Sequence, residues 1–197
     1  LEETVQRALA VVPASNVLVL TNVAQLKGTQ QALAGLLPAA QIVAEPAKRD
    51  TAPAAALATA LVRARAGEQA TLALLPADAF IADVATFGRQ LETAFVDAAT
   101  RGSLITLGVK PDHAATGFGY LELGPEDESR PGDTPIRKVK RFVEKPDQAT
   151  AGQYVASGNY VWNAGIFVWS VGAFLAEAER SAPELAAFIQ AFPAGAA

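Results

Sequence analysis

The chain has 197 residues, and 51% of them are hydrophobic, a fraction that excludes an intrinsically disordered polypeptide. Its formal net charge of −4 argues against a nucleic-acid-binding surface, which is usually basic, but still allows a pocket that holds a small anion on a few cations. No apolar run approaches the roughly 18 residues that a membrane span needs. We therefore expect no nucleic acid and no membrane among its partners.

Two residue types are missing from the sequence. The absence of cysteine excludes disulfides and thiolate metal sites, and it fits a reducing cytosol, so we expect a cytoplasmic protein. The absence of methionine indicates that Leu1 is not the natural start. The first residues include two acids and no apolar core segment, so they do not resemble a signal peptide. A homodimer is left open.

Helix-like and strand-like stretches alternate in the first half of the chain. The expected helices cover residues 1–12, 22–36, 50–67 and 82–101, and the expected strands cover 16–21, 41–45, 70–78 and 103–109. Asn22 is a candidate N-cap for the second helix, and Asp50 or Thr51 for the third, which has Pro53 in its first turn and Gly67 past its end. Because the strands are apolar on both faces, the order predicts an α/β fold whose largely parallel sheet is covered by helices.

The second half has a different pattern. Two strands, 117–124 and 136–145, flank a polar, disorder-prone loop over 124–135. A helix over 147–157, an apolar run over 159–169, a helix over 171–181 capped by Ser170, and a last helix within 182–192 follow. No internal repeat and no domain-scale linker is present in the sequence.

Ligands of open α/β sheets bind at the carboxyl ends of the strands, where Asp78 follows the apolar stretch "LALLP". One carboxylate there can hold Mg²⁺ when substrate phosphates supply other oxygens. The alternative role is an N-cap for the helix that starts near Ile81, and spacing alone does not separate the two.

The segment "EPAKRDTAP" places Glu45, Lys48, Arg49, Asp50 and Thr51 before a helix start. The free backbone N–H groups of a helix start suit an anion or the edge of a base. Composition alone favours the simpler interpretation, an ordinary charged loop between a strand and a helix.

Two polar sites remain in the second half. Glu144 and Lys145 end a strand, either as a surface ion pair of little energetic value or as contacts for sugar hydroxyls and a phosphate. Asn163 lies in the apolar run "YVWNAGIFVW", where an amide needs a partner. That partner is either backbone at a bulge marked by Gly165 or a ligand, and the sequence leaves both open.

Three further residues carry weaker signals. Gly117 and Gly119 flank Phe118, and glycines in a strand often mark a bulge or a close approach of a ligand. His113, the only histidine, lies in a polar loop and is assigned no role, which removes Ser-His-Asp chemistry.

Six segments in this order, "VLVLTN", "EPAKRDTAPAAALA", "LLPADAFI", "ITLGVKPDHAATGFGYLELG", "RFVEKPD" and "SGNYVWNAGIFVW", resemble the sugar-nucleotide pyrophosphorylase superfamily. They cover most of residues 16–169 and look most like its mannose-1-phosphate guanylyltransferase branch. "RDTAPA" favours that branch, since thymidylyl-type relatives carry a Gln- and Ser-containing segment there. The resemblance implies a Rossmann-like nucleotidyltransferase domain with a mostly parallel mixed sheet and helices on both faces, of which residues 1–197 are a part.

The resemblance also implies a reaction. A phosphate oxygen of mannose 1-phosphate attacks the α-phosphorus of GTP in line, with Mg²⁺ and without a covalent intermediate. Asp78 and Lys145 would be catalytic, with Asp78 on Mg²⁺ and Lys145 on the sugar phosphate. The mannose would contact Gly119, Glu144 and Asn163. Glu45 would accept hydrogen bonds from the N–H groups of the guanine. The turn after it, Asp50, Thr51, Ala52 and Pro53, would line the rest of the guanine site.

Three departures from the family pattern accompany the resemblance. The glycine-rich loop G-G-x-G-T-R-L-W-P-L-S-R is absent and would precede Leu1, and a second metal-binding Asp would follow Ala197. Ala79 replaces a family histidine. We therefore expect residues 1–197 alone to be nearly inactive. The alternatives are another hexose-1-phosphate nucleotidylyltransferase and a non-catalytic regulatory subunit that binds sugar nucleotides.

Overall fold

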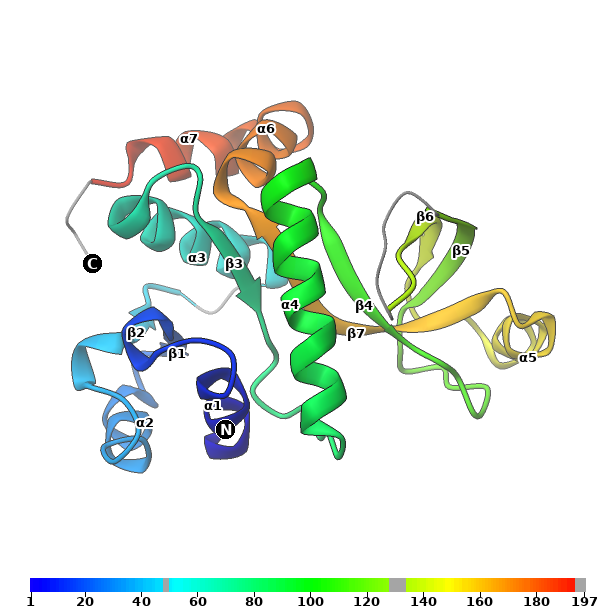
Figure 1. Cartoon of the computed structure of the whole chain (residues 1–197), viewed down its shortest axis with the longest axis horizontal. Coiled ribbons are helices and arrows are strands. Elements are labelled where there is room, and N and C mark those ends of the chain that lie inside the picture. Colours follow the sequence, from blue (N-terminus) through cyan, green and yellow to red (C-terminus); the bar gives the residue numbers. More distant parts are fainter. Residues whose placement is uncertain (48–49, 128–133, 194–197) are drawn as a thin grey trace. The chain divides into compact units, whose positions relative to one another are not determined.

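The computed structural model describes residues 1–47, 50–127 and 134–193 (Figure 1). Its helices are α1 (Glu2–Leu9), α2 (Leu26–Ala32), α3 (Thr51–Ala66), α4 (Val84–Arg101), α5 (Gln148–Ser157), α6 (Val171–Ser181) and α7 (Pro183–Ala191). Its strands are β1 (Val19–Asn22), β2 (Ile42–Glu45), β3 (Thr71–Leu74), β4 (Ile105–Val109), β5 (Tyr120–Glu126), β6 (Arg137–Val143) and β7 (Tyr160–Ser170). The predicted α/β class is confirmed. None of the described helices is both long and apolar enough to cross a membrane.

The chain forms two compact units. Unit 1 comprises Leu1–Ile105 and Val168–Ala197, and unit 2 comprises Thr106–Phe167. Strand β7 runs from unit 2 into unit 1. Each unit is described by itself below.

The strands form two sheets among the described residues. Strands β1 and β2 pair in parallel, with Asn22 opposite Glu45 at their carboxyl ends. The second sheet has the order β3-β7-β5-β6, and β4 also pairs with β7. Within it, β5 runs antiparallel to both β6 and β7. The predicted parallel pairing is thus present between β1 and β2, whereas β3 and β4 pair with β7 in the second sheet. The predicted hairpin is present as β5 and β6.

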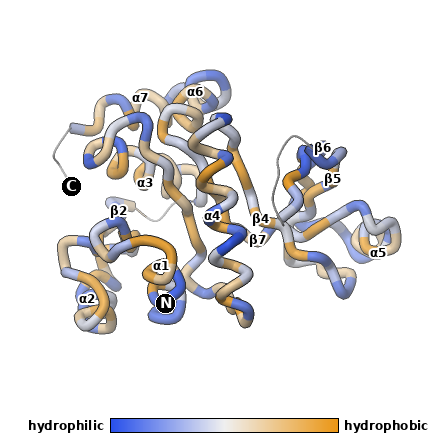
Figure 2. Tube along the Cα trace, in the orientation of Figure 1, coloured by the Kyte–Doolittle hydropathy of each residue, from blue (hydrophilic) through white to orange (hydrophobic). Residues whose placement is uncertain are grey.

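Strand β6 forms one edge of the second sheet and is strongly basic. It carries Arg137, Lys138, Lys140 and Arg141, all exposed, and is the blue segment at the β6 label of Figure 2. Charged side chains on an edge strand discourage pairing with another chain. The loop before β6 was predicted to be disorder-prone, and its residues 128–133 lie outside the described part of the chain.

The alanine-rich helix α3 packs against α6 and α7 in unit 1. Small side chains allow helices to approach closely, and the buried cluster at this contact consists of Ala56, Ala60, Leu175, Ala178, Ala186 and Ile189. Trp169, near the end of β7, donates from Nε1 to the fully buried hydroxyl of Thr59, 3.0 Å away on α3. Because a buried indole N–H needs an acceptor, this bond fixes the end of β7 against α3.

Some predicted boundaries need correction. Helix α2 is shorter than the predicted 22–36, and its N-cap is Gln25. Asn22 instead ends β1, and its Oδ1 accepts a hydrogen bond from the backbone N–H of Gln25, 2.9 Å away. The prediction failed because the first hydrogen-bonded turn after Asn22 does not continue directly as an α-helix. Other caps were predicted correctly: Ser170 accepts from Ala173 at the start of α6, and Gly67 ends α3 with a φ of 81°.

Candidate functional site

Asp78 lies in an exposed turn that follows β3 in unit 1. The apolar stretch was predicted to be a strand through Asp78, but β3 ends at Leu74, and Pro76, which follows two residues later, has no N–H to continue a ladder. The proposed N-cap role of Asp78 is wrong. Asp83 caps α4, and its Oδ1 accepts from the backbone N–H of Thr86 at 2.9 Å. That N–H also lowers the pKa of Asp83.

The carboxylate of Asp78 has no hydrogen-bond or ion-pair partner within the ranges that the structure describes, and no described group of three Asp, Glu, His or Cys side chains could hold a metal. A metal at Asp78 would therefore have at most two such ligands within the described ranges and would need phosphate and water oxygens for the rest. This donor set suits Mg²⁺, which keeps several waters and is often held by one or two carboxylates and substrate phosphates.

The predicted guanine segment begins where β2 ends. Glu45 is half-buried and is the last residue of β2, opposite Asn22. Asp50 is the N-cap of α3, but its side chain makes no capping hydrogen bond. Thr51 and Ala52, at the exposed start of α3, therefore have backbone N–H groups that no described side chain caps. Lys48 and Arg49 lie outside the described residues.

Asn163 lies on β7 within unit 2, and its side-chain oxygen has two donors. Oδ1 accepts from the hydroxyl of Thr106 on β4 at 2.8 Å and from the backbone N–H of Gly165 at 3.2 Å. Gly165 has a φ of 69°, the left-handed conformation that glycine adopts without strain. The backbone partner predicted at Gly165 is therefore present. The Nδ2 group of Asn163 has no hydrogen-bond partner among the described residues, so two donors remain for a ligand.

Gly119 lies beside the same part of β7, because its carbonyl accepts from the backbone N–H of Asn163 at 2.8 Å. A Cβ added to Gly119 would lie 2.9 Å from Cζ of Phe142 and 3.0 Å from Oε2 of Glu144. The close neighbours of Gly119 are thus side chains of the same unit, and the predicted close approach of a ligand stays a prediction. Around Gly117, nothing lies within 4 Å of an added Cβ. Gly119, Glu144 and Asn163 consequently form one local cluster in unit 2.

Lys145 has unusual backbone geometry. Its φ of 44° is the only positive value at a non-glycine residue in the described part of the chain. The left-handed region costs about 1–2 kcal/mol for a residue with a Cβ, and such strain concentrates at functional sites. Nζ of Lys145 lies 3.8 Å from Oε1 of Glu144, and both side chains are more than half exposed. This long, exposed ion pair stabilises the fold little, so both charges remain available to a ligand.

Two residues of this region were missed by sequence reasoning. Thr106 positions the Asn163 oxygen, and no sequence signal connects residues 57 positions apart. Trp162 contacts the rings of His113 and Phe118, at centroid distances of 4.9 and 5.1 Å, and its buried Nε1 has no hydrogen-bond partner among the described residues. His113 is exposed, as predicted, and contacts Asp112, whose pKa it lowers by hydrogen bonding.

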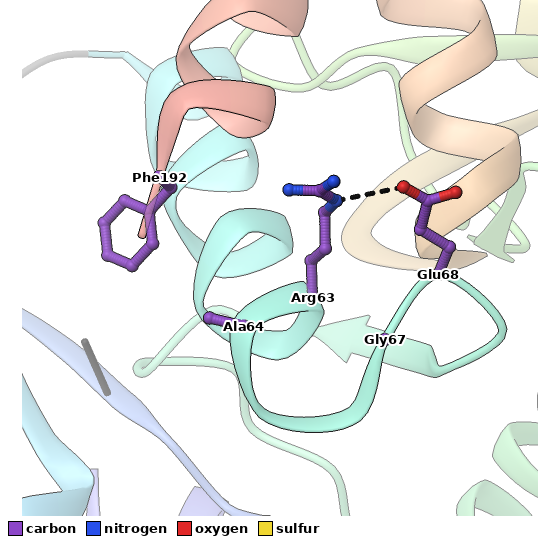
Figure 3. A pocket seen from close by; sticks show the side chains of 5 residues that line it. All are labelled: Arg63, Ala64, Gly67, Glu68 and Phe192. Carbon is purple, nitrogen blue, oxygen red and sulfur yellow. Dashed lines mark hydrogen bonds and ion pairs between the residues drawn. The ribbon is translucent and has the colours of Figure 1, made fainter. Parts of the chain in front are cut away.

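A hollow elsewhere in unit 1 is not the predicted site. It is lined by Arg63, Ala64, Gly67, Glu68 and Phe192, none of which is a predicted site residue (Figure 3). The guanidinium of Arg63 pairs with Glu68 at 3.1 Å and donates to the carbonyls of Ile189 and Gln190, near the end of α7. These contacts hold α3 and α7 together. The polar groups of Arg63 and Glu68 in the hollow therefore have a structural role, and we assign no ligand to it.

The predicted site residues divide between the two units. Asp78, Glu45 and the start of α3 belong to unit 1, whereas Gly119, Glu144, Lys145 and Asn163 belong to unit 2. The structure brings together the cluster around Asn163. The convergence of Asp78 with that cluster on one cleft stays a prediction.

Comparison with known proteins assigns the family. The family model described as "Nucleotidyl transferase" matches residues 2–195, nearly the whole chain. The chain belongs to the nucleotidyl transferase family. Xanthan biosynthesis protein XanB of Xanthomonas campestris pv. campestris is 42% identical over 152 residues, which cover 77% of this chain and 30% of that protein. Mannose-1-phosphate guanylyltransferase of Escherichia coli K12 is 41% identical over 145 residues, covering 73% of this chain and 30% of that protein.

The fold of this nucleotidyl transferase chain is also similar to that of a solved structure. The crystal structure described as mannose-1-phosphate geranyltransferase from Thermus thermophilus matches with a TM-score of 0.84 and 28% identity, covering 100% of this chain and 54% of that chain. The chain thus spans about 30% of the length of the two curated relatives and about half of this structure. The predicted resemblance is confirmed at the level of the family, with mannose-1-phosphate guanylyltransferases among its relatives.

Proposed function

We propose that this chain forms part of a mannose-1-phosphate guanylyltransferase, which transfers GMP from GTP to mannose 1-phosphate. A phosphate oxygen of the sugar phosphate forms a bond to the α-phosphorus of GTP, and the bond from that phosphorus to pyrophosphate breaks. The products are GDP-mannose and pyrophosphate. No covalent enzyme intermediate is needed, because the protein contributes by positioning the reactants and neutralising their charge.

The observation that supports this proposal most strongly is the arrangement of Asn163. Its Oδ1 is occupied by Thr106 and Gly165, so its Nδ2 can donate to a sugar hydroxyl. The carboxylate of Glu144, next to Gly119, can accept from sugar hydroxyls. Together these groups offer donors and acceptors of the kind a hexose requires.

The charged groups suit the two phosphate-bearing substrates. Lys145 would neutralise the phosphate of mannose 1-phosphate, because an exposed ammonium acts as a point charge toward phosphate. Glu45 would accept from the N–H groups of guanine, with the segment Asp50–Pro53 beside the base. Mg²⁺, when bound at Asp78, would neutralise charge on the phosphates of the nucleotide.

Two alternatives remain distinct from this proposal. The chain could belong to an enzyme for another hexose 1-phosphate or another nucleotide, since base and sugar preference rest on relatives and single contacts. It could also belong to a regulatory subunit that binds sugar nucleotides without catalysis. The joint presence of Asp78, Glu144, Lys145 and Asn163, the residues that the catalytic role requires, favours that role.

A substrate matrix tests the proposal. Pyrophosphate release is measured with the complete natural polypeptide that contains these residues, using GTP, UTP, dTTP or ATP with mannose 1-phosphate or glucose 1-phosphate. The proposal predicts that GTP with mannose 1-phosphate gives the highest kcat/KM. A preference for UTP or dTTP would reject it in favour of another nucleotidylyltransferase. Binding of GDP-mannose without turnover of any pair would support the regulatory subunit.

A further inference from the structure

The turn that carries Asp78 is fastened to helix α1 on both sides of the aspartate. The hydroxyl of Thr4 donates to the carbonyl of Ala77 at 3.1 Å, and Nη2 of Arg7 donates to the carbonyl of Ala79 at 2.6 Å. Nη2 of Arg7 also donates to Oγ1 of Thr4 at 2.8 Å, which joins the two anchors to each other. The peptide units around Asp78 are therefore held at two points, while its carboxylate stays exposed.

Helix α1 presents both anchors on one face. Thr4 and Arg7 are three residues apart, a spacing that places two side chains on the same side of a helix. The neighbouring Val5 packs into a separate buried cluster with Val17, Leu33, Leu37 and Ile42. That cluster fixes the position of α1 in unit 1 by apolar contacts. The positions of Thr4 and Arg7, which contact the turn, are therefore fixed as well.

Arg7 is buried in a way that stability alone does not explain. Its side chain is 6% exposed, and its nearest carboxylate, on Glu3, lies 3.8 Å away and is itself 76% exposed. Its buried Nε has no hydrogen-bond partner among the described residues. Burying a guanidinium with incomplete pairing is unfavourable, and an apolar side chain of similar size would often stabilise the site more. The two hydrogen bonds that Arg7 donates lead, directly or through Thr4, to the Asp78 turn.

We propose that Thr4 and Arg7 are positioning residues that set the direction of the Asp78 carboxylate toward the metal-bound nucleotide. This inference rests on the proposed role of Asp78 as a metal ligand. Neither side chain needs to touch the substrate, because both act through the backbone on either side of Asp78. The planar guanidinium suits this task, since one nitrogen can bridge two oxygens in a fixed geometry that a lysine ammonium does not impose.

The decisive experiment compares three variants in the complete natural polypeptide: Thr4→Val, Thr4→Ser and Arg7→Lys. Thr4→Val removes the hydroxyl at nearly constant volume, whereas Thr4→Ser keeps it. We expect Thr4→Val and Arg7→Lys to raise the Mg²⁺ concentration for half-maximal activity about tenfold, the usual scale for loss of a group that orients a metal ligand. The KM for mannose 1-phosphate should stay within about twofold of the wild-type value, and Thr4→Ser should restore the wild-type Mg²⁺ requirement.

A second readout needs no metal. Cleavage within residues 76–80 by a protease of broad specificity is followed by mass spectrometry in the absence of nucleotide. The two disruptive variants should speed this cleavage several-fold, because the turn has lost one of its two anchors and opens more often. If Arg7→Lys fails to fold, the pair Thr4→Val and Thr4→Ser decides the question by itself.

Arg63→Lys provides the matched control. Arg63 also donates from a helix in unit 1 to backbone carbonyls, those of Ile189 and Gln190, but it does not contact the Asp78 turn. This variant should leave both the Mg²⁺ requirement and the rate of cleavage within residues 76–80 unchanged. An equal shift in Arg63→Lys and Arg7→Lys would overturn the inference, because it would reflect a general loss of stability.

Asp78→Asn separates failure of this inference from failure of the proposed function. A raised Mg²⁺ requirement in Asp78→Asn, with none in Thr4→Val or Arg7→Lys, would overturn the positioning role alone. An unchanged Mg²⁺ requirement in Asp78→Asn would overturn the metal-ligand role and the positioning inference with it.

Discussion

The hydroxyl of Thr106 donates a 2.8 Å hydrogen bond to Oδ1 of Asn163, from β4 to β7 within unit 2. The backbone N–H of Gly165 points at the same side-chain atom, at 3.2 Å, and a backbone N–H can only donate. The atom between them is therefore the amide oxygen, and the amide nitrogen faces the other way. The two hydrogen bonds to Oδ1 therefore fix the orientation of the Asn163 amide, and its Nδ2 group presents two N–H donors on the other side.

Replacing Thr106 by valine should allow the side-chain amide of Asn163 to change its orientation. Thr106→Val removes one of the two donors to Asn163, so the amide can rotate and the KM for mannose 1-phosphate should rise about tenfold, as for loss of roughly 1.4 kcal/mol of binding. The free energy of unfolding should fall by about 1 kcal/mol, the usual net value of one hydrogen bond. Steady-state kinetics and urea unfolding check the two effects. Thr106→Ser keeps the hydroxyl, and an equally raised KM in this variant would contradict the account.

The close approach at Gly119 gives a second prediction. An alanine Cβ there would meet the exposed ends of Phe142 and Glu144, which can move aside, so the stability should change by less than about 1 kcal/mol. The displaced Glu144 carboxylate should nevertheless raise the KM for mannose 1-phosphate several-fold. Gly117→Ala is the control, because nothing lies within 4 Å of a Cβ at that position. Equal kinetic effects of the two substitutions would show that Gly119 has no special place beside the sugar.

The buried bond between Trp169 and Thr59 predicts a stability effect in unit 1. Thr59→Val leaves the indole N–H without its acceptor, which should lower the free energy of unfolding by about 1–3 kcal/mol. Urea unfolding followed by tryptophan fluorescence measures this change. Thr100→Val is the control, since both hydroxyls donate to the carbonyl four residues earlier at 2.7 Å, but Thr100 is exposed. Its effect should stay within about 0.5 kcal/mol, and a similar loss in both variants would contradict the role given to Trp169.

The start of α5 predicts a pH dependence of stability. The backbone N–H of Thr150 and then its hydroxyl lower the pKa of the Asp147 cap, whose Oδ1 lies 2.8 Å from that N–H. A carboxyl with a lower pKa in the folded state stabilises the fold above its unfolded pKa of about 3.9, and this stabilisation disappears as the pH falls through the folded value. Asp147→Asn can still cap but does not titrate. Thermal melts from pH 6 to pH 2 should show a smaller loss for Asp147→Asn than for the wild type, and parallel curves would refute the assignment.

Local signals in the sequence predicted the fold well. The caps at Ser170 and Gly67 follow from a residue beside a helical pattern, and the strands β1 to β4 follow from short apolar runs. Sequence reasoning named Asp78 as a candidate cap for the helix that follows and missed Asp83, the actual cap of α4. That choice depends on where the chain turns after β3, and the turn is anchored to Arg7, 72 positions away from Ala79.

The sequence supplied candidate site residues, but it did not reveal the hydrogen bonds that hold them in place. Glu144, Lys145 and Asn163 were identified from segments that resemble a family, and the glycine beside Glu144 from its type. Thr106, Thr4 and Arg7 were not, because each acts through a hydrogen bond to a segment distant in sequence. A threonine in a strand and an arginine in a helix are common surface residues, so neither pattern indicates a polar contact that orients a site.

The central claim is that the free amide nitrogen of Asn163 binds the sugar, and one comparison tests it most directly. Asn163→Asp keeps the shape and an oxygen that can accept from Thr106 and Gly165, but it replaces the two donors by a second oxygen. The control is Asn159→Asp, an exposed position in the same unit that makes the same change in charge. The account predicts that kcat/KM for mannose 1-phosphate falls about a hundredfold in Asn163→Asp and stays near the wild-type value in Asn159→Asp. Equal kcat/KM values in the wild type and Asn163→Asp would contradict the account.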